Sequence, residues 1–194
     1  MTRPVLQIIS ASTRAGRKGI AVARWVQRFA SQHGGFDVEL VDLAEVGLPV
    51  FDEPNHPRLR QYVHQSTKDW SATVSRADAF VFVTPEYNHS FPASLKNALD
   101  HLSAEWADKA AGLVSYGVHG GVRAAEHLRL VLGEVQIADV RQQVSFAFAT
   151  DFENYSVLTP TGGQEAQLTT QLDQLVAWAG ALQSVRAEKL AAAA

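Results

Sequence analysis

The stretch FVFVTPEYNHSFPASLKNALDHL, residues 80–102, holds a strand, a polar loop and a helix in direct succession. Its apolar start, residues 80–83, is typical of a strand that is buried on both faces. The helix pattern begins at Pro92 and places four apolar residues on one face: Leu95, Ala98, Leu99 and Leu102. A strand joined to a helix by a short loop is the repeating unit of α/β proteins with parallel sheets.

The same alternation extends over the whole chain. Strands are predicted at residues 5–10, 36–43, 79–84, 110–116 and 140–148. Helices are predicted at residues 19–33, 58–76, 92–103, 121–135 and 167–189. The pattern favours a doubly wound parallel sheet of five strands with helices on both faces. We expect a single domain over residues 1–190 and a disordered tail at 191–194.

Composition excludes several classes of protein. The 194 residues contain no cysteine, which excludes disulfides, thiol catalysis and cysteine-ligated metal clusters. The net charge of −3 lacks the basic excess of a nucleic-acid surface, so no nucleic-acid partner is expected. No apolar stretch approaches the roughly 20 residues that span a bilayer, and the first residues do not resemble a signal peptide. We therefore expect a cytoplasmic protein without a membrane partner.

Three strand ends carry unusual residues. They are SASTRAGRKG (10–19), TPEYNHSF (84–91) and YGVHGGVR (116–123). Ligands of open α/β sheets bind at the carboxyl ends of the strands. If the strand order is 2-1-3-4-5, the first, third and fourth strands are neighbours and their loops meet in one pocket.

The first of these loops has the chemistry of an anion site. Ser12 offers a hydroxyl, Arg14 and Arg17 offer guanidinium groups, and the loop leads into a predicted helix N-terminus. Phosphate is the natural ligand for this set. An ordinary solvated turn is the alternative. Neither G-x-x-x-x-G-K-[ST] nor G-x-G-x-x-G occurs here, which disfavours nucleoside triphosphates and a Rossmann-type dinucleotide site.

The other two loops suit a flat ring. Tyr87 supplies an apolar face with a polar tip, Asn88 supplies a donor and an acceptor, and Pro85 stiffens the loop. Three glycines after the fourth strand allow close backbone approach to a ligand: Gly117, Gly120 and Gly121. The alternative for Tyr87 is that it only covers the core. The alternative for the three glycines is that they only shape a turn.

Together STRAGR, PEYNHSFPASLKNALDHL and SYGVHGGVRAAEHLR resemble the NADPH-dependent FMN reductase family, which has a flavodoxin-like fold. The matching motifs span residues 5–135. The chain departs from the family pattern at Ala11, where glycine is usual. The resemblance implies the strand order 2-1-3-4-5, FMN as cofactor, and NADPH or NADH as reductant.

The resemblance also implies roles for individual residues, with no catalytic side chain among them. The FMN phosphate would be held by Ser12, Arg14 and Arg17. The isoalloxazine ring would be lined by Pro85, Glu86, Tyr87 and Asn88. Its other wall would be formed by Ser115, Gly117, Gly120 and Gly121.

The expected activity is hydride transfer from nicotinamide to flavin, followed by electron transfer to a flavin, quinone, azo compound or similar acceptor. A flavodoxin-type FMN electron carrier is the alternative, although such carriers are commonly more acidic. A serine hydrolase is disfavoured because the run from Gly112 to Gly117 is one residue too long for G-x-S-x-G, and Ser115 lies inside a strand pattern. A metal site is disfavoured because the histidines are scattered.

A homodimer or tetramer is also expected. Phe91 and Trp106 flank the helix predicted at 92–103 and fall outside its apolar face. The irregular segment 47–57 adds three apolar residues: Leu48, Val50 and Phe51. The alternative is that these side chains pack onto their own domain. Lys96 and Asp100 are either an exposed pair on one helix or, as the resemblance implies, charges near a subunit interface.

Overall fold

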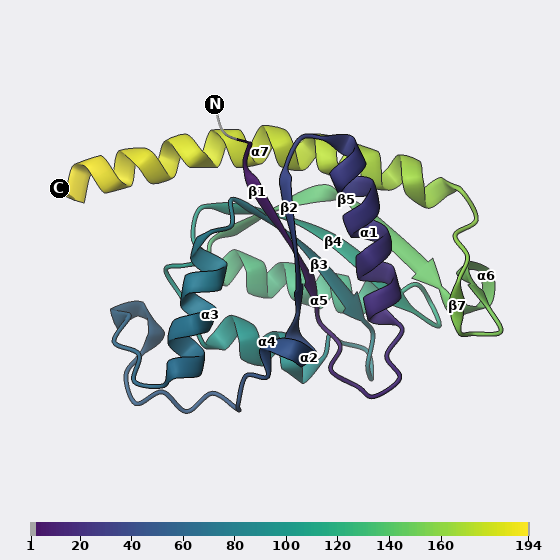
Figure 1. Ribbon diagram of the computed structural model, residues 1–194, viewed down its shortest axis with the longest axis horizontal. Coiled ribbons are helices and arrows are strands. Elements are labelled where there is room, and N and C mark those ends of the chain that lie inside the picture. Colours follow the sequence, from purple (N-terminus) through teal and green to yellow (C-terminus); the bar gives the residue numbers. More distant parts are fainter. Residues whose placement is uncertain (1–2, 194) are drawn as a thin grey trace.

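Five parallel strands form one sheet in the order β2-β1-β3-β4-β5 in the computed structural model, which describes residues 3–193 (Figure 1). The strands are β1 (Val5–Ser10), β2 (Asp37–Asp42), β3 (Ala79–Pro85), β4 (Lys109–Gly117) and β5 (Ile137–Ala147). The order 2-1-3-4-5 and the flavodoxin-like fold class are confirmed. Every residue of β3 is buried, as the apolar run at 80–83 predicts.

Five helices cover the sheet within the described part of the chain. They are α1 (Gly19–His33), α3 (Gln65–Ser75), α4 (Ala93–Asp100), α5 (Val122–Glu134) and α7 (Gly163–Ala193). Shorter elements are α2 (Leu43–Val46), the 3₁₀ turn η1 (Pro57–Leu59), α6 (Phe148–Asp151), and a hairpin of β6 (Phe152–Glu153) and β7 (Val157–Leu158). None of the helices in residues 3–193 combines the length and apolar character that a membrane span requires.

Alternation along β3 divides the core into two layers. Val81 and Val83 pack toward α1 and α7, whereas Phe80 and Phe82 pack toward α3, α4 and α5. Successive side chains of a strand point to opposite faces of the sheet, so one apolar run supplies both layers. Figure 1 shows the two layers, with α1 and α7 on one side of the sheet and α3, α4 and α5 on the other.

The placement of Trp106 at a subunit interface is wrong. Its side chain is fully buried, with its ring centre 5.1 Å from that of Phe80 and 5.9 Å from that of Trp70. Its indole Nε1 donates a hydrogen bond to Leu99 O at 3.1 Å. The helix ends at Asp100, so the periodicity of α4 no longer governs residue 106, and the following turn directs Trp106 into the core.

The helix predicted at 58–76 is also wrong in its first half. The turn η1 ends at Leu59, the next residue Arg60 has a positive φ of 53°, and α3 begins only at Gln65. The carboxylate of Glu53 accepts hydrogen bonds from Val63 N at 2.8 Å and His64 N at 3.1 Å. These bonds hold residues 61–64 outside the helix.

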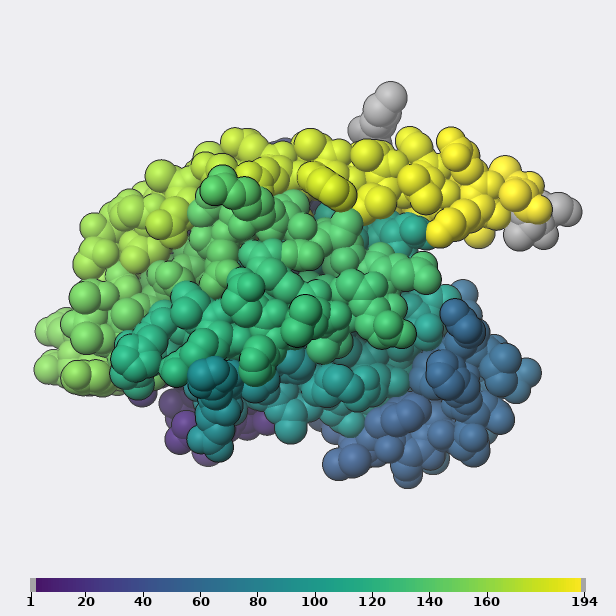
Figure 2. All heavy atoms as spheres, turned by 180° about the vertical axis from the view of Figure 1, so that it is seen from behind, coloured from purple at the N-terminus to yellow at the C-terminus, as the bar shows by residue number. Residues whose placement is uncertain are grey.

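Helix α7 runs along one edge of the molecule and projects beyond it at its C-terminal end (Figure 2). Its outer part is held by Arg186, which donates to Asp108 O at 2.6 Å and pairs with Asp78. The helix continues through Ala193, past the predicted helix end at 189, while Ala194 lies outside the described residues. A single domain over 1–190 stays a prediction.

Candidate functional site

The three loops expected to carry the site meet at one edge of the sheet. They are residues 11–18 (the β1 loop), 86–92 (the β3 loop) and 118–121 (the β4 loop). Because β1, β3 and β4 are adjacent and parallel, their carboxyl ends lie side by side. The sheet order alone therefore brings the three loops together.

Hydrogen bonds then connect the loops. Ser12 Oγ lies 2.6 Å from Tyr87 Oη, which joins the β1 loop to the β3 loop. Glu86 N donates to Tyr116 O at 3.1 Å, which extends the pairing of β3 with β4 into the β3 loop. Ser12 is fully buried, so its hydroxyl is directed at Tyr87 and not at solvent.

A cavity of about 160 Å³ opens between these loops. Its lining includes six residues expected to bind the cofactor: Arg14, Arg17, Pro85, Glu86, Tyr87 and Gly117. It also includes four that were not expected: Gly16, Lys18, Tyr116 and Phe148. Ligand pockets commonly hold roughly 300 Å³ or more, so a ligand as large as FMN would lie partly outside this cavity.

The cavity carries three cationic side chains on its β1-loop side. The guanidinium of exposed Arg14 lies 5.7 Å from the centre of the Tyr87 ring, and Lys18 Nζ lies 5.3 Å from that of Phe148. Helix α1, which follows this loop, has no acidic residue in its first turn and no side-chain cap. Cations beside an uncapped helix N-terminus favour an anion.

Arg17 is the third cation, and it has a partner that the sequence analysis did not identify. Its guanidinium forms an ion pair with Asp42, a buried residue at the end of β2. Asp42 also accepts from Ala44 N at 3.1 Å and so caps α2. Arg17 Nε is buried and has no hydrogen-bond partner within residues 3–193.

Glu86 lines the cavity, but its carboxylate is directed at Arg123 in the first turn of α5. The two side chains form an ion pair, and Glu86 Oε2 accepts from Arg123 N at 3.2 Å. Burial would raise the pKa of Glu86, but hydrogen bonds from Arg123 and its positive charge outweigh burial and hold this pKa below its ordinary value of 4.5. The carboxylate is therefore ionised at neutral pH.

Ser115 fixes the shape of the β4 loop. It is fully buried within β4, and its hydroxyl donates to Gly120 O at 2.6 Å. A buried hydroxyl committed to this bond has no access to a substrate, which argues against the serine hydrolase alternative. At Gly121 φ is +70°, and a Cβ there would lie 2.7 Å from Tyr116 N, so the close approach of this loop to β4 requires glycine.

Asn88 belongs to a tight turn at the tip of the β3 loop. Tyr87 and Ser90 exchange two backbone hydrogen bonds of 2.8 and 3.1 Å, and both central residues have positive φ, 48° at Asn88 and 76° at His89. Two-residue hairpin turns of this type favour Asn at a central position. The turn explains the residue type, and the role of Asn88 toward a ring stays a prediction.

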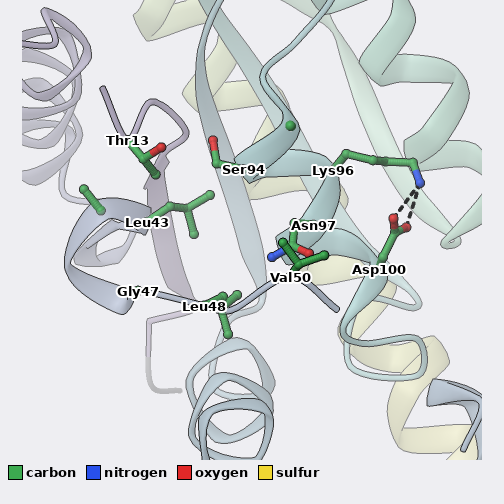
Figure 3. Close-up of a pocket in the computed structure, with 11 residues that line it drawn as sticks. Thr13, Leu43, Gly47, Leu48, Val50, Ser94, Lys96, Asn97 and Asp100 are labelled. Atoms are coloured by element: carbon green, nitrogen blue, oxygen red, sulfur yellow. Dashed lines mark hydrogen bonds and ion pairs between the residues drawn. The ribbon is translucent and has the colours of Figure 1, made fainter. Parts of the chain in front are cut away.

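A larger cavity of about 740 Å³ lies beside the β1 loop, between α2 and α4 (Figure 3). It is lined by Thr13, Leu43, Ala44, Gly47, Leu48, Val50, Ala93, Ser94, Lys96, Asn97 and Asp100. The two charged residues of this lining pair with each other, with Lys96 Nζ 2.7 and 2.8 Å from the carboxylate oxygens of Asp100. It contains none of the residues expected to bind the cofactor, so the larger of the two cavities is not the one whose residues suit FMN. The chemistry of a phosphate and a flat ring is found at the smaller one.

Residues 5–151 match the sequence model of the NADPH-dependent FMN reductase family. The chain belongs to this family. An NAD(P)H-dependent FMN reductase of Schizosaccharomyces pombe is 43% identical over 132 residues, which are 67% of this chain and 66%, just under two thirds, of that protein. An FMN-dependent NADPH-azoreductase of Staphylococcus saprophyticus is 30% identical over 178 residues, 88% of this chain and 93% of that protein.

A solved structure shows the same fold. The flavoenzyme NAD(P)H:acceptor oxidoreductase FerB of Paracoccus denitrificans has a TM-score of 0.70 at 22% identity, covering 91% of this chain and 97% of that chain. The family and its relatives are oxidoreductases, named for FMN and a reduced nicotinamide. The predicted family, enzyme class and cofactors are confirmed.

The residues of the smaller cavity fit the FMN of this reductase family. A phosphate requires N–H donors, and the unpartnered Nε of Arg17 lies in the lining together with Arg14 and Lys18. A flat ring requires a wall made of an apolar side chain and of backbone that can approach the ring closely. Tyr87 and Gly117 supply it.

Sequence reasoning about this reductase missed Lys18, Tyr116 and Phe148 in the lining, and the partners Asp42 and Arg123. Arg123 could have been assigned, because it stands in the G-G-x-R part of the family pattern. Asp42 ends the second strand and Phe148 follows the fifth, and neither strand end carries a motif. Their proximity to the loops comes from the tertiary structure.

We predict that Gly121→Ala destabilises the reductase far more than Gly16→Ala. Both glycines have φ near +70°, so each alanine costs about 1–2 kcal/mol of backbone strain. Only Gly121→Ala adds a clash with Tyr116, of about 1–3 kcal/mol, because nothing lies within 4 Å of a Cβ at Gly16. Urea unfolding compares the two variants, and equal losses would show that the β4 loop does not need this close approach.

Proposed function

We propose that this reductase holds FMN at the junction of the β1, β3 and β4 loops and uses NADPH or NADH to reduce a small-molecule electron acceptor. The observation that carries the proposal is one cavity whose lining combines Arg14, Arg17 and Lys18 with the aromatic ring of Tyr87. Bound FMN supplies the redox chemistry, taking electrons from the nicotinamide and passing them to the acceptor. The chain's own residues bind and orient it.

The residues expected to bind FMN are proposed to have different roles, and five of them lie outside the lining of the cavity: Ser12, Asn88, Ser115, Gly120 and Gly121. Arg14 and Arg17 bind the phosphate, with Lys18 beside them, and Ser12 holds Tyr87 in place, because its buried hydroxyl lies 2.6 Å from Tyr87 Oη. Tyr87, Pro85 and Asn88 line the ring, and Gly117 with Gly120 and Gly121 forms its other wall. Ser115 and Glu86 contribute by holding the β4 loop and α5 in place.

The acceptor is proposed to be a free flavin, a quinone or an azo compound. The support is that relatives of similar length are named FMN reductases and azoreductases. A net charge of −3 provides little electrostatic attraction for docking a redox partner protein, which disfavours the flavodoxin-type carrier. We also propose a cytoplasmic location, where a nicotinamide-dependent reductase meets its reduced cofactor.

The test is turnover by the purified protein. Mixed with FMN and NADPH, and then with an azo dye or a quinone, the protein is expected to oxidise NADPH continuously while acceptor is present. The visible spectrum reports whether flavin is bound. Bound FMN without nicotinamide oxidation would indicate the carrier, and absence of FMN binding would falsify the proposal.

We predict that Arg14→Ala weakens FMN binding by about 1.5–3 kcal/mol, the range for a hydrogen bond to a charged group. Arg14 is exposed at the cavity, so its loss leaves the fold intact. Quenching of flavin fluorescence on titration measures the affinity. Arg24→Ala, which removes an exposed arginine of α1, is the matched control and should bind FMN as the unchanged protein does.

We further propose that the chain forms a homodimer, or a tetramer built from such dimers. Trp106 does not support this, and Phe91 and Leu48 pack partly onto their own core. The support that remains is Val50, which is 84% exposed at the mouth of the larger cavity. A second copy seated there would bury Val50 and lie next to the β1 loop.

We predict that Val50→Asp dissociates the dimer, because a carboxylate would be buried without a partner. Sedimentation of the unchanged protein is expected to give at least twice the 21.1 kDa of one chain. The matched control is Leu130→Asp, which alters an equally exposed apolar residue on α5, 78% exposed. A monomeric parent protein, or equal behaviour of the two variants, would place the interface elsewhere or exclude it.

A further inference from the structure

Helix α5 begins at the β4 loop without a cap of its own. Its N-cap residue is Gly121, which has no side chain to accept a hydrogen bond from the first turn. Ser, Thr, Asp or Asn would normally serve here. The 2.7 Å approach of a Cβ to Tyr116 N excludes each of them at this position.

Glu86 of the β3 loop takes over this task from outside the helix. Its carboxylate accepts from Arg123 N at 3.2 Å and pairs with the Arg123 guanidinium, so both the backbone and the side chain of one residue in the first turn are bound. A carboxylate at a helix N-terminus is also favoured by the helix dipole. The Glu86 side chain is 8% exposed and that of Arg123 is 41% exposed, so solvent screens this ion pair from the Arg123 side.

We propose that Glu86 and Arg123 are positioning residues, which set the distance between the two walls of the flavin site by tying the β3 loop to the start of α5. This inference rests on the proposed FMN site. The two walls lie close together at Glu86, since a Cβ at Gly117 would lie 3.5 Å from Glu86 Cβ. Movement of α5 away from Glu86 would therefore widen the flavin site.

The charged and titratable groups near α5 do not disrupt the ion pair between Glu86 and Arg123. His89 Nδ1 lies 3.4 Å from Arg123 Nη1 on the solvent side, and Glu126 of α5 pairs with Arg129. The lowered pKa of Glu86, in which Arg123 overcomes the effect of burial, agrees with a carboxylate that stays charged beside the helix. Glu86 thus acts on the flavin through α5.

The experiment compares Glu86→Ala, Glu86→Gln and the control Glu126→Gln, each as flavin-free protein and in titrations with FMN. Glu86→Ala removes the acceptor and the charge. It is expected to speed amide hydrogen exchange in the first turn of α5 by about 5- to 30-fold, as for loss of a helix cap, and to weaken FMN binding by a similar factor. Glu86→Gln keeps an acceptor oxygen for Arg123 N and should restore part of both losses.

A double-mutant cycle identifies the partner. If Glu86 acts through Arg123, then Glu86→Gln and Arg123→Gln together should weaken FMN binding by less than the product of their separate factors. Glu126→Gln lies on the exposed side of the same helix and should change neither exchange nor affinity. Since Glu86→Gln preserves most of the contacts, it replaces Glu86→Ala in the comparison if Glu86→Ala does not fold.

Two outcomes would overturn the proposal. Weaker FMN binding with unchanged exchange in α5 would mean that Glu86 contacts the flavin directly. Faster exchange with unchanged FMN affinity would mean that the cap stabilises the helix without setting the site. Failure of the unchanged protein to bind FMN would contradict the proposed function itself. The exchange data need no flavin, so they test the helix cap independently of that result.

Discussion

The rest of the structure depends on the position of β3 between β1 and β4. Parallel pairing sets Ser10 opposite Val83 and Thr84 opposite Ser115, so the three strands end within a few residues of one another. A strand buried along its whole length cannot shift its register without exposing apolar side chains. The relative positions of the β1, β3 and β4 loops are therefore fixed by the core, and the site inherits its geometry from the sheet.

The sequence carried enough information for this sheet and for much of the site. The apolar run at 80–83 predicts a doubly buried strand, and the polar loop after it predicts a ligand site at its end. What could not be predicted depends on contacts made beyond the element in question. Trp106 lies past the end of α4, where helical periodicity gives no guidance, and the late start of α3 depends on hydrogen bonds that Val63 N and His64 N donate to Glu53. Asp42 carries no motif, and its pairing with Arg17 exists only after β2 is placed beside β1.

Electrostatic pairing distinguishes the cations around the site. Arg17 and Arg123 each have a carboxylate partner, Asp42 and Glu86, and each of these acids also caps the start of a helix. Arg14 is exposed and Lys18 contacts the ring of Phe148, so their charges are not neutralised by such pairs. An anion that enters the cavity therefore meets a positive potential mainly from these two residues. Arg123 acts on the walls of the site through Glu86, whereas Arg17 pairs with Asp42 and also lines the cavity.

The bonds that shape the loops are all made within the chain. Ser12 bonds to Tyr87, Ser115 to Gly120 and Glu86 to Arg123. A site whose loops are already held by such bonds loses less conformational entropy when a ligand binds, and this strengthens binding. The Nε of Arg17 differs, because it is buried at the cavity without a partner, and a buried unpaired donor costs about 1–3 kcal/mol. An anion oxygen that accepts from this N–H would relieve that cost, which favours an anion as the ligand of the β1 loop.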